Sequence, residues 1–220
     1  MSDAADRTRL AILISGRGSN MSAVLEAAKD PAYPAEPVLV LANRPGAKGL
    51  EIAAEAGIAA VAIDHKPHGK DREAFERAMQ DVLLAHGTEF VALAGFMRVL
   101  TPWFVHQWSG RMVNIHPSLL PKYKGLDTHA RAIEAGDREA GCTVHWVSEG
   151  VDEGNIIGQA RVPIVEGDTP DTLAARILPE EHRLYPKALA QAILDWRARR
   201  DSAGTRRSRQ GPLTRRQSRQ

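Results

Sequence analysis

Short apolar runs alternate with helically spaced apolar positions along the first half of the chain. The runs, which predict buried β-strands, lie at residues 9–15, 38–42, 59–63, 90–94 and 111–115. Between them, apolar side chains at helical spacing predict amphipathic helices at residues 21–28, 48–56 and 71–86. This alternation predicts an α/β fold with a mostly parallel, doubly wound (Rossmann-like) sheet and helices on both faces.

The pattern changes after residue 125. A short helix is predicted at residues 128–135, and two β segments follow at 143–148 and 155–164. An acidic turn at residues 149–154 joins these two segments. A hairpin of this kind predicts a C-terminal antiparallel addition to the sheet.

A long helical pattern closes the folded part of the chain and runs to Trp196. Thr169 is the expected N-cap of this helix, and Pro170 stands at its first position, where a missing N–H costs nothing. Pro179 lies inside the pattern, so the helix is expected to kink or split there.

The positive charge of the chain is concentrated at its C-terminal end. Residues 197–220 carry nine arginines against one acid, a net charge of +8, which leaves −6 for the rest of a chain whose total is +2. Residues 202–220 contain few apolar side chains, so we expect a disordered, Arg-rich tail after a single domain of residues 1–201. The alternative for this tail is an RNA-contacting arm, although the acidic body gives no sign of a nucleic-acid-binding face.

The cysteine content and the hydropathy of the chain indicate its compartment. Cys142 is the one cysteine, which excludes an intrachain disulfide and is compatible with a reducing environment. The sequence has no apolar run of membrane-spanning length, and its first residues lack the pattern of a signal peptide. We therefore expect a cytoplasmic protein that does not bind membranes.

A glycine-rich turn, residues 16–20, follows the first predicted strand and opens the first helix. A dinucleotide-binding fingerprint would need a third glycine where this chain has Met21, and a P-loop would need a following Gly-Lys-Ser/Thr. The backbone N–H groups of residues 18–20 at a helix N-terminus instead predict a generic phosphate site. The structural alternative is that Ser19 merely caps the helix.

Asn114 and His116 stand at the end of the fifth predicted strand. Side chains two residues apart in a strand point to the same face, so the carboxamide and the imidazole are expected to share one pocket. A carboxamide can donate to a developing oxyanion, and an imidazole can carry a proton near neutral pH. The alternative is a capped strand end with a surface histidine.

Neither candidate nucleophile in the sequence fits covalent catalysis. Ser118 lacks the glycines of a nucleophile elbow, and Cys142 begins an apolar segment where a small buried thiol is expected. If the site transfers an acyl group, the acceptor must therefore belong to a substrate. Asp152, on the acidic turn, is a candidate partner that would raise the pKa of His116, although it could equally be a turn residue.

Metal-binding patterns are weak in this sequence. His65 and His68 lie in a loop without a neighbouring cysteine or carboxylate pair, and the segment 180–182 lacks the second histidine of a zincin helix. We therefore predict that the protein holds no metal ion.

Four motifs stand in order at residues 14–20, 93–100, 114–121 and 151–154. Together they resemble the phosphoribosylglycinamide formyltransferase family, the folate-dependent glycinamide ribonucleotide transformylases of purine synthesis, over about residues 9–196. The resemblance implies transfer of a formyl group from 10-formyltetrahydrofolate, as co-substrate, to the amine of glycinamide ribonucleotide, N1-(5-phosphoribosyl)glycinamide. The products would be the N-formyl compound and tetrahydrofolate, on the route to IMP.

The resemblance also implies roles for individual residues. A nucleotide-binding half is expected at about residues 8–110 and a catalytic, folate-binding half at about residues 111–201. The implied site residues are Asn114, His116 and Asp152 for catalysis; Gly18, Ser19, Asn20 and Glu181 for glycinamide ribonucleotide; and Arg72, Met97, Arg98, Val99, Leu100 and Asn114, with the turn at 148–152, for folate. Leu178 and Pro179 depart from the polar or helix-compatible residues expected before Glu181.

Other functions predict different sequence features. Methionyl-tRNA formyltransferase resembles a longer chain, with a folded C-terminal domain and Trp-Arg-Gly where this sequence has residues 122–125. Formyltetrahydrofolate hydrolase would be expected to carry a further N-terminal domain, and a non-catalytic nucleotide sensor would leave Asn114, His116 and Asp152 without a role. We expect small-molecule substrates, a low chance of nucleic-acid binding, and a monomer or a homodimer.

Overall fold

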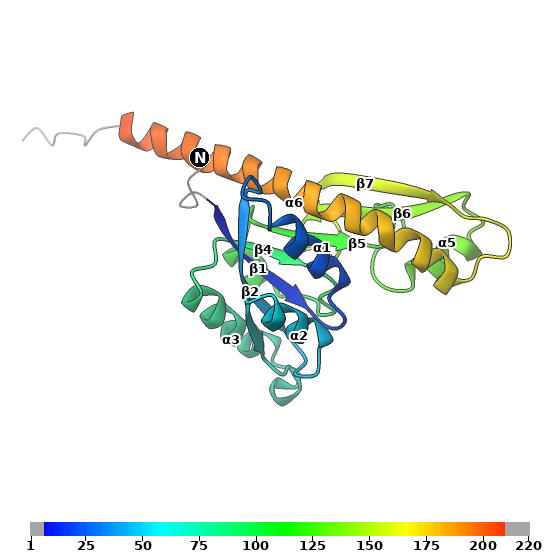
Figure 1. Ribbon diagram of the computed structural model, residues 1–220, viewed down its shortest axis with the longest axis horizontal. Helices are drawn as coiled ribbons and strands as arrows, with labels where there is room; N and C mark the ends of the chain where they lie inside the picture. The colour runs from blue at the N-terminus through cyan, green and yellow to red at the C-terminus, as the bar shows by residue number, and fades with distance from the viewer. Residues whose placement is uncertain (1–6, 210–220) are drawn as a thin grey trace, which may run out of the picture.

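The computed structural model describes residues 7–209, which form one mixed sheet covered by helices (Figure 1). In chain order the elements are β1 (Thr8–Ile14), α1 (Ser19–Ala27), β2 (Ala35–Ala42), α2 (Lys48–Glu55), β3 (Ala59–Ala62), the 3₁₀ turn η2 (Lys66–His68), α3 (Arg72–Ala85), β4 (Phe90–Leu93), α4 (Pro102–Gln107), β5 (Met112–His116), α5 (Thr128–Glu134), β6 (Glu139–Trp146), β7 (Ile156–Pro163) and α6 (Pro170–Arg209).

The strand order of the sheet is β3-β2-β1-β4-β5-β6-β7. The pairs among β1 to β5 are parallel, whereas β6 joins β5 in antiparallel register and β7 joins β6 in the same way. The predicted fold class, a doubly wound parallel sheet with a C-terminal antiparallel addition, is therefore confirmed. The chain moves outward from β1 to β3 and then returns to β4 on the other side of β1. Ligands of such sheets bind at this switch point, beyond the carboxyl ends of the strands.

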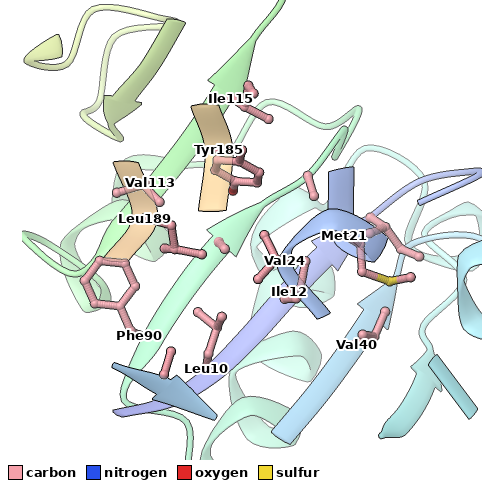
Figure 2. Packing of buried hydrophobic residues seen from close by; sticks show 14 of the residues in the cluster. Leu10, Ile12, Met21, Val24, Val40, Phe90, Val113, Ile115, Tyr185 and Leu189 are labelled. Carbon is pink, nitrogen blue, oxygen red and sulfur yellow. The ribbon is translucent and has the colours of Figure 1, made fainter. Parts of the chain in front are cut away.

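Helices cover both faces of the sheet, so the central strands β1 and β4 are buried on both sides. Leu10 and Ile12 of β1 point to the face covered by α1 and α6, where they belong to one cluster with Val24, Tyr185 and Leu189 (Figure 2). The alternate residues of β1 point to the opposite face, which α3 and α4 cover. Burial of both faces explains why the predicted strands are continuously apolar instead of alternating.

Three details differ from the prediction. Helix α4 and the turn η2 were not predicted, and β6 begins at Glu139, ahead of the predicted 143–148 segment. The start of α4 carries a recognisable signal, since Thr101 is its N-cap, with its side chain accepting from the N–H of Phe104, and Pro102 is its first residue. Helix α4 has only 6 residues, too few to show a helical period.

The C-terminal helix α6 is continuous from Pro170 to Arg209, so Pro179 does not split it, and a kink at Pro179 stays a prediction. The prediction of its start is confirmed, because the hydroxyl of Thr169 accepts from the N–H of Thr172 at 3.2 Å. Packing of the buried residues Tyr185 and Leu189 against the sheet offsets the hydrogen bonds that proline removes.

The end of α6 extends past the edge of the sheet (Figure 1). Its helical backbone continues to Arg209, beyond the predicted domain end at residue 201. The rest of the predicted tail, residues 210–220, lies outside the described residues. The division into a domain of residues 1–201 and a disordered tail therefore stays a prediction.

Candidate active site

The predicted site residues come from loops and strand ends at the carboxyl edge of the parallel sheet. The glycine turn follows β1, the segment 97–100 follows β4, and Asn114 and His116 end β5. Since β1, β4 and β5 are neighbours in the sheet, these three regions lie side by side. The strand order thus brings three sequence motifs to one edge, at the switch point.

The glycine turn has the backbone geometry of an anion site. Gly18, with φ of 75°, is the N-cap of α1 and makes no side-chain capping bond. A side chain at Gly18 would clash, because its Cβ would lie 3.0 Å from the Cα of Gly49. Ser19 is the first helical residue, so the alternative in which Ser19 caps the helix is wrong. The first N–H groups of α1, which have no acceptor within the helix, remain to bind an anion.

Asn20 and Glu181, both predicted to bind glycinamide ribonucleotide, meet in the structure. The side-chain amide of Asn20 donates to Oε2 of Glu181 at 2.6 Å, across 161 residues of sequence. Burial raises the pKa of Glu181, and the bond from Asn20 acts in the opposite direction. Within residues 7–209, Oδ1 of Asn20 is buried without a hydrogen-bond partner. A buried acceptor without a partner, beside a buried carboxyl group, is suited to a ligand hydroxyl.

The structure brings Asp152 to His116, across 36 residues that the sequence could not bridge. Nδ1 of His116 lies 3.3 Å from Oδ2 of Asp152, and both side chains are at least nine-tenths buried. The same carboxylate oxygen accepts from the N–H of Gly125 at 2.9 Å. Nε2 of His116 lies 2.9 Å from the carbonyl oxygen of Tyr123. Asp152 has a φ of 54°, a conformation that non-glycine residues seldom adopt and that is often found at functional sites.

Asn114 and His116 belong to one network, which runs through Asp152 and through His145, a residue that the sequence did not single out. Nε2 of His145 lies 3.1 Å from Nδ2 of Asn114 and 3.5 Å from Oδ1 of Asp152. His145 faces Asn114 because β5 and β6 pair in antiparallel register. That register was the missing information, since the alternation of β6 alone does not show which residue lies opposite Asn114.

Burial lowers the pKa of His116 below its ordinary value. The carbonyl of Tyr123 and the carboxylate of Asp152 raise this pKa, whereas His145 lowers it further. The prediction that Asp152 raises this pKa is therefore confirmed, although desolvation outweighs its effect and leaves the pKa of His116 below its ordinary value. The pKa of Asp152 is itself lowered: burial raises it, but hydrogen bonds from His145 and Gly125 and the charge of His116 act more strongly together.

The segment 97–100 forms an open coil between β4 and α4. Met97 and Val99 are 61% and 55% exposed, which is unusual for large apolar side chains and leaves them free to contact a ligand. Arg98 lies between them, and Leu100 packs partly against the core. Arg72, the first residue of α3, is exposed and acts electrostatically on Glu76, which bonds Thr101 at the end of this segment. Arg72 and the segment 97–100, both predicted to bind folate, are thus connected through Glu76.

A cavity of about 540 Å³ lies beside the loop that follows β5. Its walls are residues 117–123, the start of α5 and the outer ends of β6 and β7. Asn114, His116 and Asp152 do not line this cavity. The strand-end cluster is the better candidate for chemistry, because it combines a donor, a titratable base and a buried carboxylate.

The sequence also led to predictions about Cys142 and about metal binding. The Cys142 thiol is fully buried and its pKa is raised to about 12, which confirms the prediction of a small buried thiol. Across residues 7–209 no group of His, Cys, Asp or Glu side chains is arranged to hold a metal ion. In the same range, no helix combines the length and the apolar character that crossing a bilayer requires.

Comparison with known proteins shows the family of the chain. The profile of the family described as formyl transferase matches residues 8–189, and the chain belongs to this family. The crystal structure of phosphoribosylglycinamide formyltransferase from Brucella melitensis superimposes with a TM-score of 0.80 at 49% identity, over 85% of this chain and 96% of that chain.

Two curated relatives are similar to this chain at 42% and 50% identity. Phosphoribosylglycinamide formyltransferase of Escherichia coli is 42% identical over 181 residues, 82% of this chain and 85% of that protein. The trifunctional purine biosynthetic protein adenosine-3 of Drosophila melanogaster is 50% identical over 189 residues, 85% of this chain but 14% of that protein. The chain thus spans only a small part of the trifunctional relatives. The resemblance found in the sequence is confirmed, whereas the roles of single residues stay predictions.

Proposed function

We propose that this protein transfers the formyl group of 10-formyltetrahydrofolate to the amine of glycinamide ribonucleotide, in de novo purine biosynthesis. The observation that carries the proposal is the cluster of Asn114, His116 and Asp152, at the same edge of the sheet as the glycine turn and the segment 97–100. The names of the relatives from Escherichia coli and Drosophila melanogaster support it.

In the proposed reaction the substrate amine attacks the formyl carbon, and a C–N bond forms while the formyl oxygen becomes an oxyanion. The amide of Asn114 and the imidazole of His116 stabilise this oxyanion as donors. The amine then loses a proton, the bond from the formyl carbon to the folate nitrogen breaks, and that nitrogen leaves with a proton. Proton transfer through His116 and water balances the two steps, and no metal ion is needed because side chains supply both functions.

The environment of His116 suits a group that gains and loses a proton. Burial lowers its pKa, so the neutral imidazole is available near pH 7 to accept a proton. When it is charged, the Asp152 carboxylate and the Tyr123 carbonyl can accept from its two N–H groups. The carbonyl oxygen of Tyr123 already lies within hydrogen-bonding distance of Nε2 of His116. Contact between Nε2 and substrate therefore requires the loop of residues 121–128 to move.

The two substrates would lie on either side of this cluster. Gly18, Ser19 and Asn20 would hold the phosphoribosyl part through the free N–H groups of α1, and Glu181 would accept from the ribose hydroxyls. Folate would lie against the segment 97–100 (Met97, Arg98, Val99 and Leu100), the turn at 148–152 and Asn114, with Arg72 at the border. Arg72 would pair with a carboxylate of the folate.

We also infer that the protein works in the cytoplasm on small molecules, as a monomer or a homodimer. The fully buried Cys142 thiol is compatible with a reducing compartment. The measurement of oligomeric state is light scattering after size-exclusion chromatography.

The test supplies purified protein with 10-formyltetrahydrofolate and either glycinamide ribonucleotide or Met-tRNA, and measures the N-formyl product of each. We expect formylation of glycinamide ribonucleotide only. Asn114→Ala should lower kcat by about two to three powers of ten with little change in KM, the usual cost of an oxyanion donor.

The matched control is Asn155→Ala, because the side chain of Asn155 is exposed and its backbone carbonyl is the group that pairs with Trp146. This control should keep normal kcat. Formylation of Met-tRNA instead of glycinamide ribonucleotide would contradict the proposed substrate, and a near-normal kcat for Asn114→Ala would contradict the role of that residue.

A further inference from the structure

The segment 97–100 has to hold its shape without secondary structure. Met97 and Val99 expose most of their apolar surface, and coil residues of this kind move freely unless side chains elsewhere restrain them. Both ends of the segment are restrained, and in each case a buried polar side chain accepts from a backbone N–H group.

The first restraint comes from the end of β1. The N–H of Met97 donates to the hydroxyl of Ser15 at 2.7 Å, and that hydroxyl donates to Oδ1 of Asn43 at 2.6 Å. Ser15 and Asn43 are both buried. The two bonds leave the Ser15 hydroxyl a fixed orientation, so the start of the segment is tied to the residue that precedes the glycine turn.

The second restraint comes from α3. Oε1 of Glu76 accepts from the N–H of Thr101 at 2.7 Å, and Oε2 accepts from the Thr101 hydroxyl. Thr101 in turn caps α4 by accepting from the N–H of Phe104 at 3.4 Å. Glu76 is only 1% exposed, and each of its two carboxylate oxygens bonds Thr101. Burial of a carboxylate costs free energy. We therefore explain the buried position of Glu76 by its two bonds, which hold Thr101 in place.

We propose that Ser15 and Glu76 are positioning residues that hold the two ends of segment 97–100 in the conformation that recognises the folate co-substrate. This inference rests on the proposed function, since it takes the segment as part of the folate site. The two residues should differ in one respect. Glu76 bonds Thr101 at the far end of the segment. Ser15, in contrast, also adjoins the glycine turn that would bind the ribonucleotide.

The principal experiment compares Glu76→Ala and Glu76→Gln with wild type by steady-state kinetics. For Glu76→Ala we expect KM for 10-formyltetrahydrofolate to rise about tenfold or more, as for loss of hydrogen bonds to a charged group, with kcat and KM for glycinamide ribonucleotide within about twofold. Glu76→Gln should restore most of the affinity, because its amide oxygen can still accept from the N–H of Thr101 and its NH₂ can donate to the hydroxyl.

Glu73→Gln is the matched control, an exposed acid on the same helix whose carboxylate bonds Arg77. It should change none of the constants. If Glu76→Ala does not fold, as judged by circular dichroism, Thr101→Val takes its place. This variant removes the hydroxyl and keeps the N–H, so the folate KM should rise by less than the rise expected for Glu76→Ala. An unchanged folate KM in folded Glu76→Ala or Thr101→Val, or an equal rise in both KM values, would overturn the role of Glu76.

Ser15→Ala tests the other end of the segment, with Ser109→Ala, an exposed serine before β5, as control. Ser15→Ala should raise the KM of both substrates, whereas Ser109→Ala should raise neither. If folded Ser15→Ala leaves both KM values unchanged, the proposed role of Ser15 is overturned.

Binding of tetrahydrofolate, measured by calorimetry, separates this inference from the proposed function because it needs no formyl acceptor. Wild type that binds tetrahydrofolate but formylates no glycinamide ribonucleotide would contradict the proposed function alone. The dissociation constants of Glu76→Ala and wild type would then still test the restraint, and equal constants would overturn it.

Discussion

The carboxylate of Asp152 lies between the imidazoles of His116 and His145, at 3.3 and 3.5 Å. Its pKa is lowered by hydrogen bonds from His145 and Gly125 despite burial, so it is charged at neutral pH. A fixed negative charge at this distance favours the protonated form of His116. Asp152 thereby limits how far burial lowers the pKa of the imidazole.

Asp152→Asn should therefore lower the pKa of His116 below its wild-type value. The amide keeps the size of the side chain but removes the charge that raises this pKa, while burial remains. The measurement is an NMR titration of the His116 ring together with kcat/KM as a function of pH, in which the inflection assigned to His116 should move to lower pH. An unchanged titration and an unchanged profile would argue against the pairing.

At the scale of elements, helix α6 carries Glu181 to Asn20 and is anchored at its start by Asp168. The guanidinium of Arg176 donates to Oδ2 and Oδ1 of Asp168 at 2.6 and 2.8 Å, and the N–H of Val165 donates to Oδ2 at 2.8 Å. The bonds from Arg176, followed by the bond from Val165, hold the pKa of Asp168 well below its ordinary range. These bonds fix the turn that precedes α6, the helix that carries Glu181.

Asp168→Asn should lower the melting temperature, and the loss should depend on pH. A carboxyl group whose pKa is lower in the folded state stabilises the fold above its unfolded pKa of about 4 and loses this effect as pH falls through the folded value. The difference in Tm between wild type and variant should thus be large at pH 7 and shrink below about pH 4. Asp171→Asn, an exposed acid in the first turn of α6, is the control and should change Tm little at either pH. A difference that does not vary with pH would contradict this assignment.

At the scale of the whole molecule, the reversal of strand order between β1 and β4 places the site, and α6 closes one face of the sheet. Toward its end α6 is held by aromatic contacts: Trp196 packs edge-on against Phe90 at 5.8 Å, and Arg199 lies 5.0 Å over the ring of Trp146. Residues beyond these contacts are not needed to cover the sheet.

Removal of residues 202–220 should consequently leave kcat and both KM values nearly unchanged, as measured by steady-state kinetics. A longer truncation, after Asp195, removes Trp196 and Arg199 and should lower Tm, because it uncovers Phe90 and Trp146. A large loss of activity on removing residues 202–220 alone would show that the Arg-rich end takes part in catalysis or substrate binding.

The sequence by itself determined the features that depend on neighbours along the chain. The periods of apolar residues set the strands and helices, and strand geometry put Asn114 and His116 on one side of β5. The four motifs carried the family and its implied substrates. These determinants are short-range, since they follow from backbone sterics, side-chain alternation and turn chemistry within a few residues.

Only the tertiary structure decided which distant groups meet and how deeply they are buried. The register of β5 and β6 brought His145 to Asn114, and the packing of α6 brought Glu181 to Asn20. Burial, which no local pattern measures, outweighed the charge of Asp152 in setting the pKa of His116. Packing against the sheet likewise kept α6 continuous through Pro179. Contacts and desolvation depend on the whole fold, whereas periodicity depends on the chain alone.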